Sequence, residues 1–455
     1  MHRFHADRFF QGGRTGSFVL ALICLLITLS GCSPLFSGVS GSNGAKPTVV
    51  ILQPSPTPTT VSTTSPTLLS DSGVAQELVQ NMSLDEKLGQ MTIVEFYGST
   101  LTADDIQMVH ADHVSGVLIE NKNGNAQTSN QLFELNQALQ GQAQIPLFIS
   151  TDFEGGIVNE LRQITGERPS EQQIGATGNP QVAFNAGLGA AQDLKALGLN
   201  VNFMPIVDVL TNPNNPGLPM RTFGSNPTLV TNMGRAYLQG LTQGGVIGCL
   251  KHFPGLGSAT VDPHYSLPYM NRSLATMNAV DFVPYRTMIN EGIVPMVMVT
   301  HILNPQLDPK LPTSLSPKVV TGLLRDQLHF NGVIISDTLW MGGISNTYSL
   351  AQAAVLAVKA GEDLILGPRG LSDTQSMLTG LKQAVESGQI SMNQVNASVQ
   401  RILELKLKYN ILSRDRASQL LENAGAFTSY PNTTGTWERI AVNGTRVGDV
   451  KRPAA

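Results

Sequence analysis

Short apolar runs recur along the chain from residue 73 onward, and each run is continuous instead of alternating between apolar and polar positions. Such runs are typical of strands that are covered on both faces, as in a parallel sheet. The predicted strands are Met91–Phe96, Gly116–Glu120, Pro146–Thr151, Val201–Val207, Val246–Phe253, Pro295–His301, Gly332–Asp337 and Asp363–Gly367.

Segments with apolar residues at helical spacing lie between most of these strands, and two more follow the last strand. The predicted helices are Asn130–Gln142, Val182–Leu197, Leu229–Gly244, Ala279–Asn290, Pro317–Leu328, Leu350–Ala360, Thr374–Ser387 and Met392–Tyr409. This alternation favours an α/β fold, namely a TIM-like (β/α)8 barrel over residues 73–410 that forms a single catalytic domain. A doubly wound open sheet is the alternative, because the number of strands does not show whether the sheet closes.

Polar residues at the ends of the strands help to choose between these two folds. In a barrel, chemistry gathers at the carboxyl ends of the strands. A Rossmann-type sheet would instead carry a glycine-rich turn after its first strand, which this sequence lacks. The pattern therefore favours the barrel. The polar strand ends are Asp152 and Glu154, Asp208, Lys251 and His252, His301, and Asp337.

The N-terminus has the pattern of a secretion signal. Arginines precede an apolar run of twelve residues, Phe18–Leu29, which is too short to span a bilayer but suits a signal peptide. The run ends in Leu29-Ser30-Gly31-Cys32, which resembles the bacterial lipobox. We therefore expect a signal peptide over residues 1–31, a lipid-modified Cys32 and a location at the outer face of the cell membrane. An ordinary secretory signal or an uncleaved anchor is the alternative.

Two segments flank the predicted barrel. Residues 32–72 are rich in Pro, Ser and Thr, a composition that buries too little apolar surface to fold, and we expect an extended linker there. Residues 411–455 are expected to form a partly disordered tail. With Cys24 removed and Cys32 acylated, Cys249 is left alone in an apolar segment, so it is interpreted as a buried packing residue.

Composition and charge exclude several classes of function. Apolar residues make up 41% and charged residues 14% of the chain, which is enough for a sizeable core. A net charge of −4 over 455 residues, without a long basic run, gives no reason to expect a nucleic-acid partner. The sequence has no metal-ligand spacing, phosphate loop or nucleotide fingerprint, so we expect neither a metal nor a cofactor. We expect a monomer.

Five short segments at or near strand ends point to one family. They are Asp152-Phe-Glu-Gly-Gly156, Asn202-Phe-Met-Pro-Ile-Val-Asp208, Arg221-Thr-Phe-Gly224, Lys251-His-Phe-Pro-Gly255 and Ile335-Ser-Asp337. Together and in this order they resemble glycoside hydrolase family 3, and within it the bacterial β-N-acetylglucosaminidases of the NagZ type. The resemblance runs from Met82 to Lys406, and it implies a retaining glycosidase that acts on a carbohydrate.

The resemblance also assigns the catalytic residues. Asp337 is expected to be the nucleophile, which attacks the anomeric carbon and forms a glycosyl-enzyme intermediate. From the residues alone, the alternative is that Asp337 caps a helix. Asp262 and His264 occupy the positions of the acid/base dyad, in which a carboxylate orients an imidazole that titrates near neutrality. The alternative is an Asp-x-His loop that merely caps a turn.

The same resemblance implies a set of substrate-binding residues at the strand ends. Asp152, Arg221, Lys251 and His252 are expected to hydrogen-bond the hydroxyls of the non-reducing-end sugar. Lys251 and His252 have an alternative role in a structural ion-pair network around Asp208. Glu154 and Asp208 are expected to support the ligand-binding residues, and His301 is a weaker candidate.

Four positions depart from the family's pattern. A second histidine is often present where this chain has Leu256, and Ser or Thr usually separates the dyad residues where it has Pro263. Glu160 stands where an arginine is usual, with Arg162 two residues further on. Trp340 lies in a stretch that is more acidic in relatives, and it is expected either to stack on a sugar or to pack on the barrel rim.

Many relatives carry a second α/β domain, for which this chain lacks room. In family 3 β-glucosidases and β-xylosidases that domain supplies the acid/base, so its absence favours a dyad within the barrel loops. We expect an exo-acting β-N-acetylhexosaminidase that removes terminal N-acetylglucosamine from peptidoglycan fragments or chitooligosaccharides. The alternatives are another family 3 β-glycosidase and a sugar-binding lipoprotein without catalytic activity.

Overall fold

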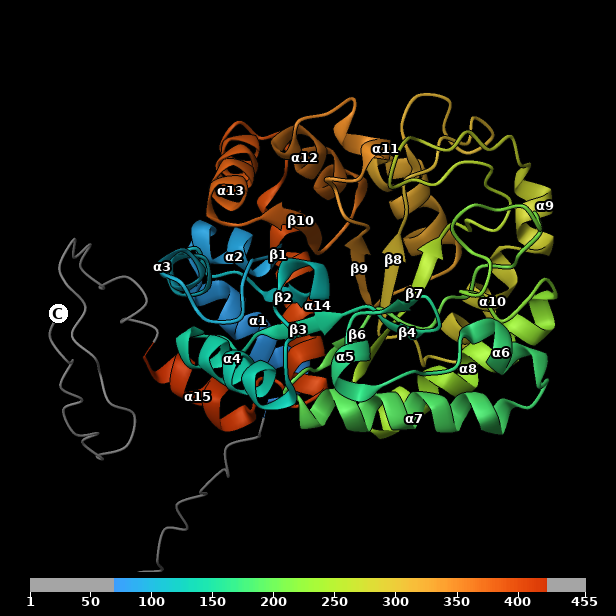
Figure 1. Ribbon diagram of the computed structural model, residues 1–455. Coiled ribbons are helices and arrows are strands. Elements are labelled where there is room, and N and C mark those ends of the chain that lie inside the picture. Colours follow the sequence, from blue (N-terminus) through green and yellow to red (C-terminus); the bar gives the residue numbers. More distant parts are fainter. Residues whose placement is uncertain (1–68, 424–455) are drawn as a thin grey trace, which may run out of the picture. The chain divides into compact units, whose positions relative to one another are not determined.

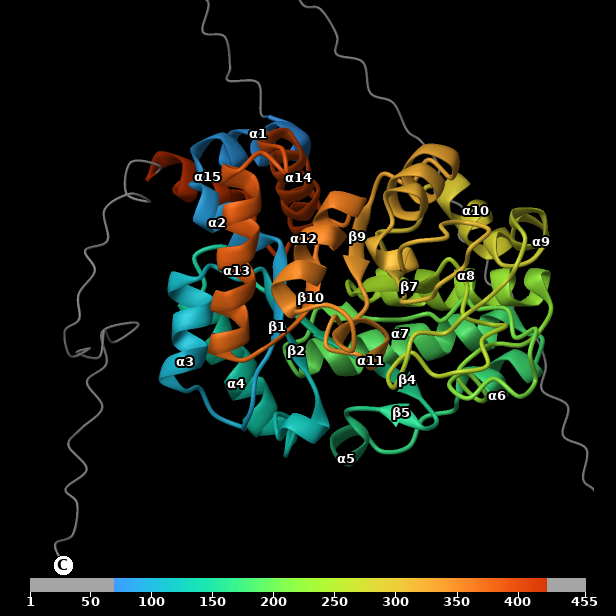
Figure 2. The ribbon, with the colours of Figure 1, turned by 90° about the horizontal axis from the view of Figure 1, so that it is seen from above.

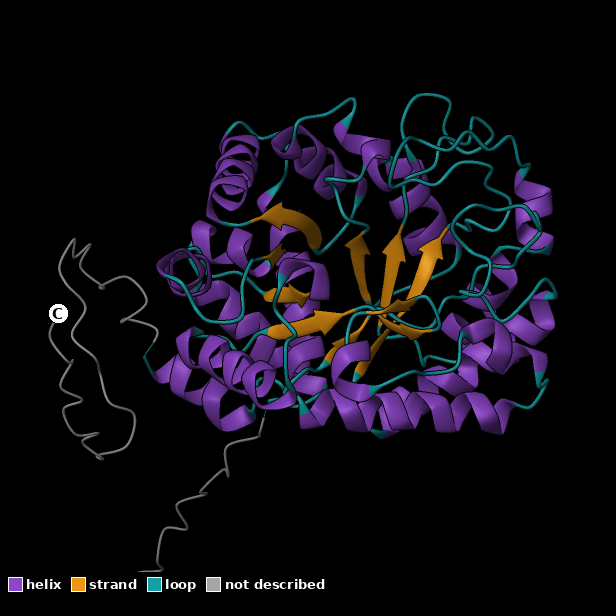
Figure 3. Cartoon of the chain, in the orientation of Figure 1, coloured by secondary structure: helices purple, strands orange, loops and turns teal. Residues whose placement is uncertain are grey.

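A computed structural model describes residues 69–423 of the chain. The predicted signal peptide, Cys32, nearly all of the linker and the end of the tail lie outside these residues. Within the described range, Figure 3 shows a central group of strands with helices around it. None of the helices in residues 69–423 is both long and apolar enough to cross a membrane.

Eight parallel strands form the centre of the fold (Figure 1). They are β1 (Thr92–Glu95), β2 (Gly116–Ile119), β3 (Phe148–Thr151), β6 (Val201–Asn202), β7 (Ile247–Phe253), β8 (Met296–Val299), β9 (Val333–Ser336) and β10 (Ile365–Arg369). Their order in the sheet is β10-β1-β2-β3-β6-β7-β8-β9. A parallel bridge between Ile335 and Leu364 brings the two outer strands together. The sheet is therefore a nearly closed barrel, which excludes the open doubly wound alternative.

The helices surround the barrel (Figure 2). They are α1 (Asp71–Asn81), α2 (Leu84–Gln90), α3 (Ala103–Ile106), α4 (Ser129–Gln142), α5 (Arg162–Thr165), α6 (Glu171–Ala176), α7 (Pro180–Ala196), α8 (Pro227–Gln243), α9 (Leu274–Ala279), α10 (Phe282–Asn290), α11 (Gly342–Ser345), α12 (Leu350–Ala360), α13 (Leu371–Glu386), α14 (Met392–Lys408) and α15 (Arg414–Glu422). The segment predicted as Ala279–Asn290 forms α10, α9 precedes it as a separate short helix, and Lys318–Gln327 is a π-helix. The helix α15 lies inside the stretch that was predicted to be a tail.

Local sequence signals set the ends of the helices. The side chain of Asn226 accepts hydrogen bonds from the amides of Thr228 and Leu229, and Pro227 occupies the first helical position of α8. At α12, Ser349 and Gln352 form a capping box, and Gly361 ends the helix in a left-handed conformation with φ of 114°. These caps satisfy backbone groups that the helix itself leaves unpaired.

Alternation along the strands separates an inner and an outer set of side chains. Alternate strand residues belong to one apolar cluster, which also contains residues of the surrounding helices. The strand members of this inner set include Ile93, Leu118, Phe148, Cys249, Met298 and Ile335. Two residues further along each strand, the next inward position lies at the carboxyl end of the barrel. These positions are Glu95, Glu120, Lys251, Thr300 and Asp337, and on β3 they are Ser150 followed by Asp152. The period of the strands thus gathers polar side chains from six strands at one end.

Candidate active site

Asp337 follows β9 and is held at the carboxyl end of the barrel by three hydrogen bonds. Its amide donates to the carbonyl of Val299 at 2.9 Å, the Thr300 hydroxyl donates to Oδ2 at 3.0 Å, and the Thr338 amide donates to Oδ1 at 2.8 Å. The nearest helix, α11, begins five residues later and has Met341 as its N-cap. Asp337 therefore does not cap a helix, and its partly exposed carboxylate faces the barrel mouth.

The surroundings of Asp337 favour its ionised form. Burial alone would raise the pKa of this carboxyl group. The imidazoles of His301, His252 and His264 and the hydrogen bond from the Thr338 amide outweigh burial, so the pKa lies below its usual value. A nucleophilic carboxylate has to be ionised at neutral pH, and this environment keeps it so.

His301 is a supporting residue beside Asp337. Its Nε2 lies 3.1 Å from the carbonyl of Thr338, and its Nδ1 lies 2.7 Å from the Ser314 hydroxyl. Since a carbonyl can only accept, Nε2 carries the proton and Nδ1 accepts from Ser314. Burial lowers the pKa of His301, although Asp337 opposes this effect. His301 thus fixes the backbone that follows Asp337.

Asp262 and His264 lie on the loop that follows β7 and form a pair. The Asp262 Oδ1 atom lies 2.7 Å from Nδ1 of His264 and also accepts the backbone amide of His264 at 3.0 Å. No hydrogen bond among residues 69–423 uses Nε2 of His264, and about half of the side chain is exposed. The carboxylate therefore both caps this turn and orients the ring.

Lys251, Asp152, Glu154 and Arg221 form one network of charges. The Lys251 ammonium lies 2.5 Å from Asp152 and 2.8 Å from Glu154. Arg221 binds Glu154 through two parallel hydrogen bonds of 2.7 and 2.8 Å. Burial opposes ionisation of Glu154, but Arg221 and Lys251 outweigh it and lower its pKa to about 2. Glu154 thus holds two cations in place, while Asp152 stays partly exposed at the barrel mouth.

His252 pairs with Asp208 instead of joining this network. The Asp208 Oδ2 atom accepts the backbone amide of His252 at 3.1 Å and lies 2.7 Å from its Nδ1. Oδ1 accepts the amide of Leu256 at 2.6 Å. The ion-pair network predicted around Asp208 therefore includes His252 but excludes Lys251. Leu256 stands where the family pattern has a histidine. The side chain of Leu256 is buried, so Asp208 binds this loop through the backbone amide of Leu256.

Glu160, the acidic departure from the family pattern, is turned towards the loop after β2. Its Oε2 accepts the amide of Asn121 at 2.7 Å, and its own amide donates to the carbonyl of Asp152. Both Asp152 and Glu160 belong to the segment that carries a short antiparallel hairpin, β4 (Phe153–Gly155) and β5 (Val158–Asn159). Arg162 binds Glu167 and the carbonyl of Gly156 at the surface, so it does not replace the missing cation.

Two carboxylates at the ends of β1 and β2 were missed by the sequence analysis. Glu95 and Glu120 are both buried, and Nδ2 of Asn123 donates to each of them at 3.1 Å. Burial and the neighbouring Glu95 raise the pKa of Glu120 to about 8, against the opposing effect of Lys122. The strand-end rule that found Asp152 and Asp337 would have found this pair too, had it been applied to the first two strands.

Trp340 belongs to the rim of the barrel. Its indole N–H donates to Glu95, which fixes the orientation of the ring. The ammonium of Lys122 lies 4.7 Å and the guanidinium of Arg369 lies 5.1 Å from the ring centroid. Because two cations already contact the ring, the structure favours packing on the rim over stacking on a sugar.

The remaining candidates carry no chemistry of their own. In residues 69–423, no group of three or more His, Cys, Asp or Glu residues has the arrangement of a metal site. Cys249 is buried inside the barrel, and burial raises the pKa of its thiol, as expected of a packing residue.

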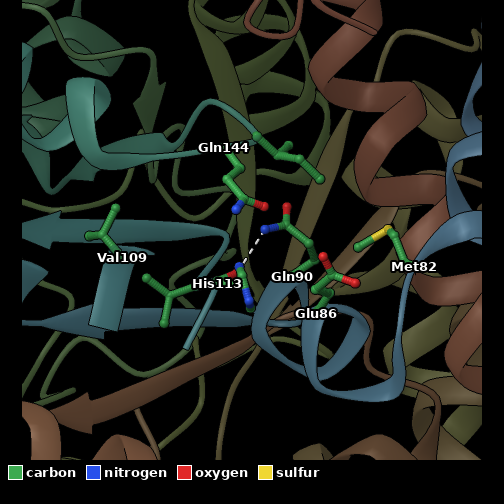
Figure 4. A pocket seen from close by; sticks show the side chains of 8 residues that line it. Met82, Glu86, Gln90, Val109, His113 and Gln144 are labelled. Carbon is green, nitrogen blue, oxygen red and sulfur yellow. Dashed lines mark hydrogen bonds between the residues drawn. The ribbon is translucent and has the colours of Figure 1, made fainter. Parts of the chain in front are cut away.

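A small pocket at the amino-terminal end of the barrel (Figure 4), beside Gln90 and His113, holds about 10 Å³, which is room for one water molecule.

Comparisons with known proteins agree on one family. Residues 83–405 match the family described as "Glycosyl hydrolase family 3 N terminal domain". The chain is 33% identical over 352 residues to "Beta-hexosaminidase A" of Pseudoalteromonas piscicida, and the alignment covers 72% of this chain. It spans only 58% of the length of that relative.

For two further relatives, the alignment covers a larger share of the relative's own length. The chain is 32% identical over 403 residues to "Beta-hexosaminidase LpqI" of Mycobacterium tuberculosis (strain ATCC 25618 / H37Rv), covering 86% of this chain and 97% of the relative. The solved structure of a glycoside hydrolase family 3 β-N-acetylglucosaminidase from Paenibacillus sp. str. FPU-7 is similar with a TM-score of 0.70 and 34% identity. That similarity covers 76% of this chain and 69% of the other.

Proposed function

Because this chain belongs to glycoside hydrolase family 3, we propose that it is a retaining exo-β-N-acetylhexosaminidase. The observation that carries the proposal is the oriented dyad of Asp262 and His264 in the same barrel mouth as Asp337. The barrel thereby contains both groups that a retaining glycosidase needs, a nucleophile and an acid/base.

In the first step, Asp337 attacks the anomeric carbon of the terminal sugar while the bond to the glycosidic oxygen breaks. Protonated His264 donates the proton from Nε2 to that oxygen, so the leaving group departs as a neutral alcohol. The carboxylate of Asp262 stabilises the imidazolium before the transfer and keeps Nδ1 protonated afterwards. The product is a covalent glycosyl ester of Asp337.

In the second step, neutral His264 takes a proton from a water molecule as the water attacks the anomeric carbon. The ester bond to Asp337 breaks, and the carboxylate leaves. Two displacements at the same carbon give net retention of configuration. A neutral imidazole also avoids placing another full negative charge beside Asp337 during the attack.

The charged network at the ends of β3 and β7 suits a sugar ring. Asp152 is the most exposed member and Arg221 is partly exposed, while the buried ammonium of Lys251 binds both Asp152 and Glu154. Donors and acceptors on rigid strand ends orient the hydroxyls of a pyranose. We assign Asp152, Arg221, Lys251 and His252 to the binding of the non-reducing-end sugar.

The proposed substrates carry terminal N-acetylglucosamine, in peptidoglycan fragments or in chitooligosaccharides. The similarity to a β-hexosaminidase from Pseudoalteromonas piscicida and to a β-N-acetylglucosaminidase from Paenibacillus supports this class. The test compares kcat/KM for an aryl N-acetyl-β-glucosaminide with kcat/KM for the matching aryl β-glucoside. We expect a clear preference for the N-acetylated substrate, and a preference for the plain glucoside would contradict the substrate assignment.

We also propose that the enzyme is a lipoprotein at the outer face of the cell membrane. The support is the Leu29-Ser30-Gly31-Cys32 pattern after a short apolar run, which lies outside the described residues. The test is metabolic labelling with a fatty acid in a bacterial host. Label is expected on the full chain and is expected to be lost in Cys32→Ser, whereas equal labelling of both would contradict the anchor.

A further inference from the structure

The loop that carries the dyad lies directly against the loop that follows the nucleophile. We call residues 262–266 the dyad loop and residues 338–346 the nucleophile loop. In Figure 1, α11 of the nucleophile loop lies beyond the carboxyl ends of β8 and β9, on the same side as the loops that follow β7. The two loops belong to different strands, so their contact determines how the acid/base lies relative to the nucleophile.

Three hydrogen bonds join the two loops, and each ends on a backbone carbonyl of the dyad loop. The amide of Gly342 donates to the carbonyl of His264 at 2.9 Å, and the amide of Gly343 donates to that of Pro263 at 3.0 Å. The side-chain amide of Asn346 donates to the carbonyl of Tyr265 at 3.2 Å. Three consecutive carbonyls around the acid/base are therefore held from one side.

Gly342 is required by the closeness of this contact. A Cβ atom at this position would lie 2.3 Å from the carbonyl oxygen of Tyr265 and 3.1 Å from that of His264. Both are backbone atoms, so no change of rotamer relieves the overlap. Gly342 has no left-handed φ, which means that the contact, and not the local backbone conformation, accounts for the glycine. At Gly343 a Cβ atom would come within 3.1 Å of the Pro263 carbonyl.

The two loops differ in how firmly they are attached to the barrel. In the nucleophile loop, Leu339, Met341 and Ile344 are buried, and the Leu339 amide donates to the carbonyl of Leu366 in β10. In the dyad loop, by contrast, the side chains of His264 and Tyr265 are exposed, the latter to 80%. Backbone contacts to the nucleophile loop therefore supply much of what fixes the dyad loop.

We infer that Gly342, Gly343 and Asn346 are positioning residues that hold the acid/base dyad in register with the nucleophile. The inference rests on the proposed role of His264 as the acid/base. A displacement of about 1 Å in a catalytic group lowers rates by roughly a hundredfold, so a contact that prevents it contributes to kcat without touching the substrate.

The test uses a series of aryl N-acetyl-β-glucosaminides whose leaving groups differ in acidity. Good leaving groups such as dinitrophenolate depart without protonation, whereas poor ones need the acid. Gly342→Ala is expected to lower kcat/KM about 10- to 100-fold for poor leaving groups and only a few-fold for dinitrophenolate. Asn346→Ala, at an exposed residue, removes one of the three bonds and is expected to show the same dependence at roughly 3- to 10-fold.

Two reference variants make the outcome decisive. Gly141 lies in α4 with nothing within 4 Å of a Cβ atom, so Gly141→Ala is expected to match the wild type. His264→Ala is expected to show the steepest dependence on the leaving group. If it shows none, the proposed function fails. If His264→Ala shows the dependence but Gly342→Ala and Asn346→Ala lose activity equally for all leaving groups, or lose none, the positioning role is refuted. Should Gly342→Ala fail to fold, Asn346→Ala alone decides.

Discussion

At the scale of single residues, the site combines one carboxylate that is free to react with several that are fully engaged. Among residues 69–423, Asp337 accepts only from Thr300 and Thr338, and it stays partly exposed. Glu154 is buried and is bound by both Arg221 and Lys251. The first arrangement suits a nucleophile, and the second suits a residue that keeps two cations in place.

Glu154→Gln is expected to lower both stability and kcat/KM. A buried cation that loses its carboxylate partner costs about 3 kcal/mol or more. The Gln amide keeps only one acceptor oxygen and no charge, so Arg221 loses one of its two bonds to that side chain. Urea unfolding measures the loss of stability. The matched control is Asp85→Asn, which breaks an exposed pair with Lys382 and is expected to change stability little, because water and salt screen exposed pairs. Equal effects of both substitutions would contradict the network.

Glu120 predicts a pH dependence of stability. Its pKa is raised from 4.5 to about 8, so between these values the folded state binds a proton that the unfolded state has lost. This group therefore makes the protein less stable as the pH rises from about 4.5 to 8, and its contribution is constant outside that range.

Glu120→Gln removes the titrating group. The variant is expected to lose less stability than the wild type between pH 5 and pH 8, as measured by thermal unfolding at a series of pH values. Parallel curves for the two proteins would show that Glu120 does not carry the proton.

At the scale of secondary-structure elements, the apolar runs predicted all eight barrel strands, because strands covered on both faces need continuous apolar sequence. The strand predicted as Val201–Val207 is shorter in the structure, where β6 covers only Val201–Asn202. Pro205 lacks the amide that would continue the regular ladder. The carbonyls of Met204 and Pro205 still accept from the amides of Cys249 and Lys251, and a bridge joins Ile206 to Lys251. The apolar pattern of one strand contains no information about which residues of the neighbouring strand it pairs with.

The candidate site was predictable where motifs lie at strand ends, and unpredictable where it depends on contacts between distant segments. The motifs predict Asp337, Asp262 and His264 as catalytic residues. The bond from Trp340 to Glu95 joins residues 245 positions apart, and nothing in either segment indicates it. The contacts between Gly342 and the dyad loop depend likewise on how two loops pack.

Asp363 joins three elements that the sequence pattern treats as independent. Its buried carboxylate accepts the amide of Ile334 in β9 and binds Arg325 of the π-helix and Arg401 of α14. Asp363→Asn is expected to cost about 3 kcal/mol in urea unfolding, because two guanidinium groups lose their common partner. A cost below about 1 kcal/mol would show that the pairs are not important for stability.

At the scale of the whole molecule, the barrel brings polar side chains from six strands to one end, although they are spread over most of the described sequence. The period-2 alternation places these side chains inward, and the loops after β7 and β9 add the dyad and its support. The candidate site is therefore a property of the nearly closed barrel and not of any one segment.

The central claim is that Asp337 forms a covalent bond to the sugar while the dyad protonates the leaving group. The most direct measurement is intact-mass and peptide mass spectrometry after reaction with a 5-fluoro-N-acetylglucosaminyl fluoride, which slows the second step. We expect one added glycosyl group, located on the peptide that contains Asp337, and none in Asp337→Ala. An adduct on another residue, or no adduct while the fluoride is turned over, would contradict the mechanism.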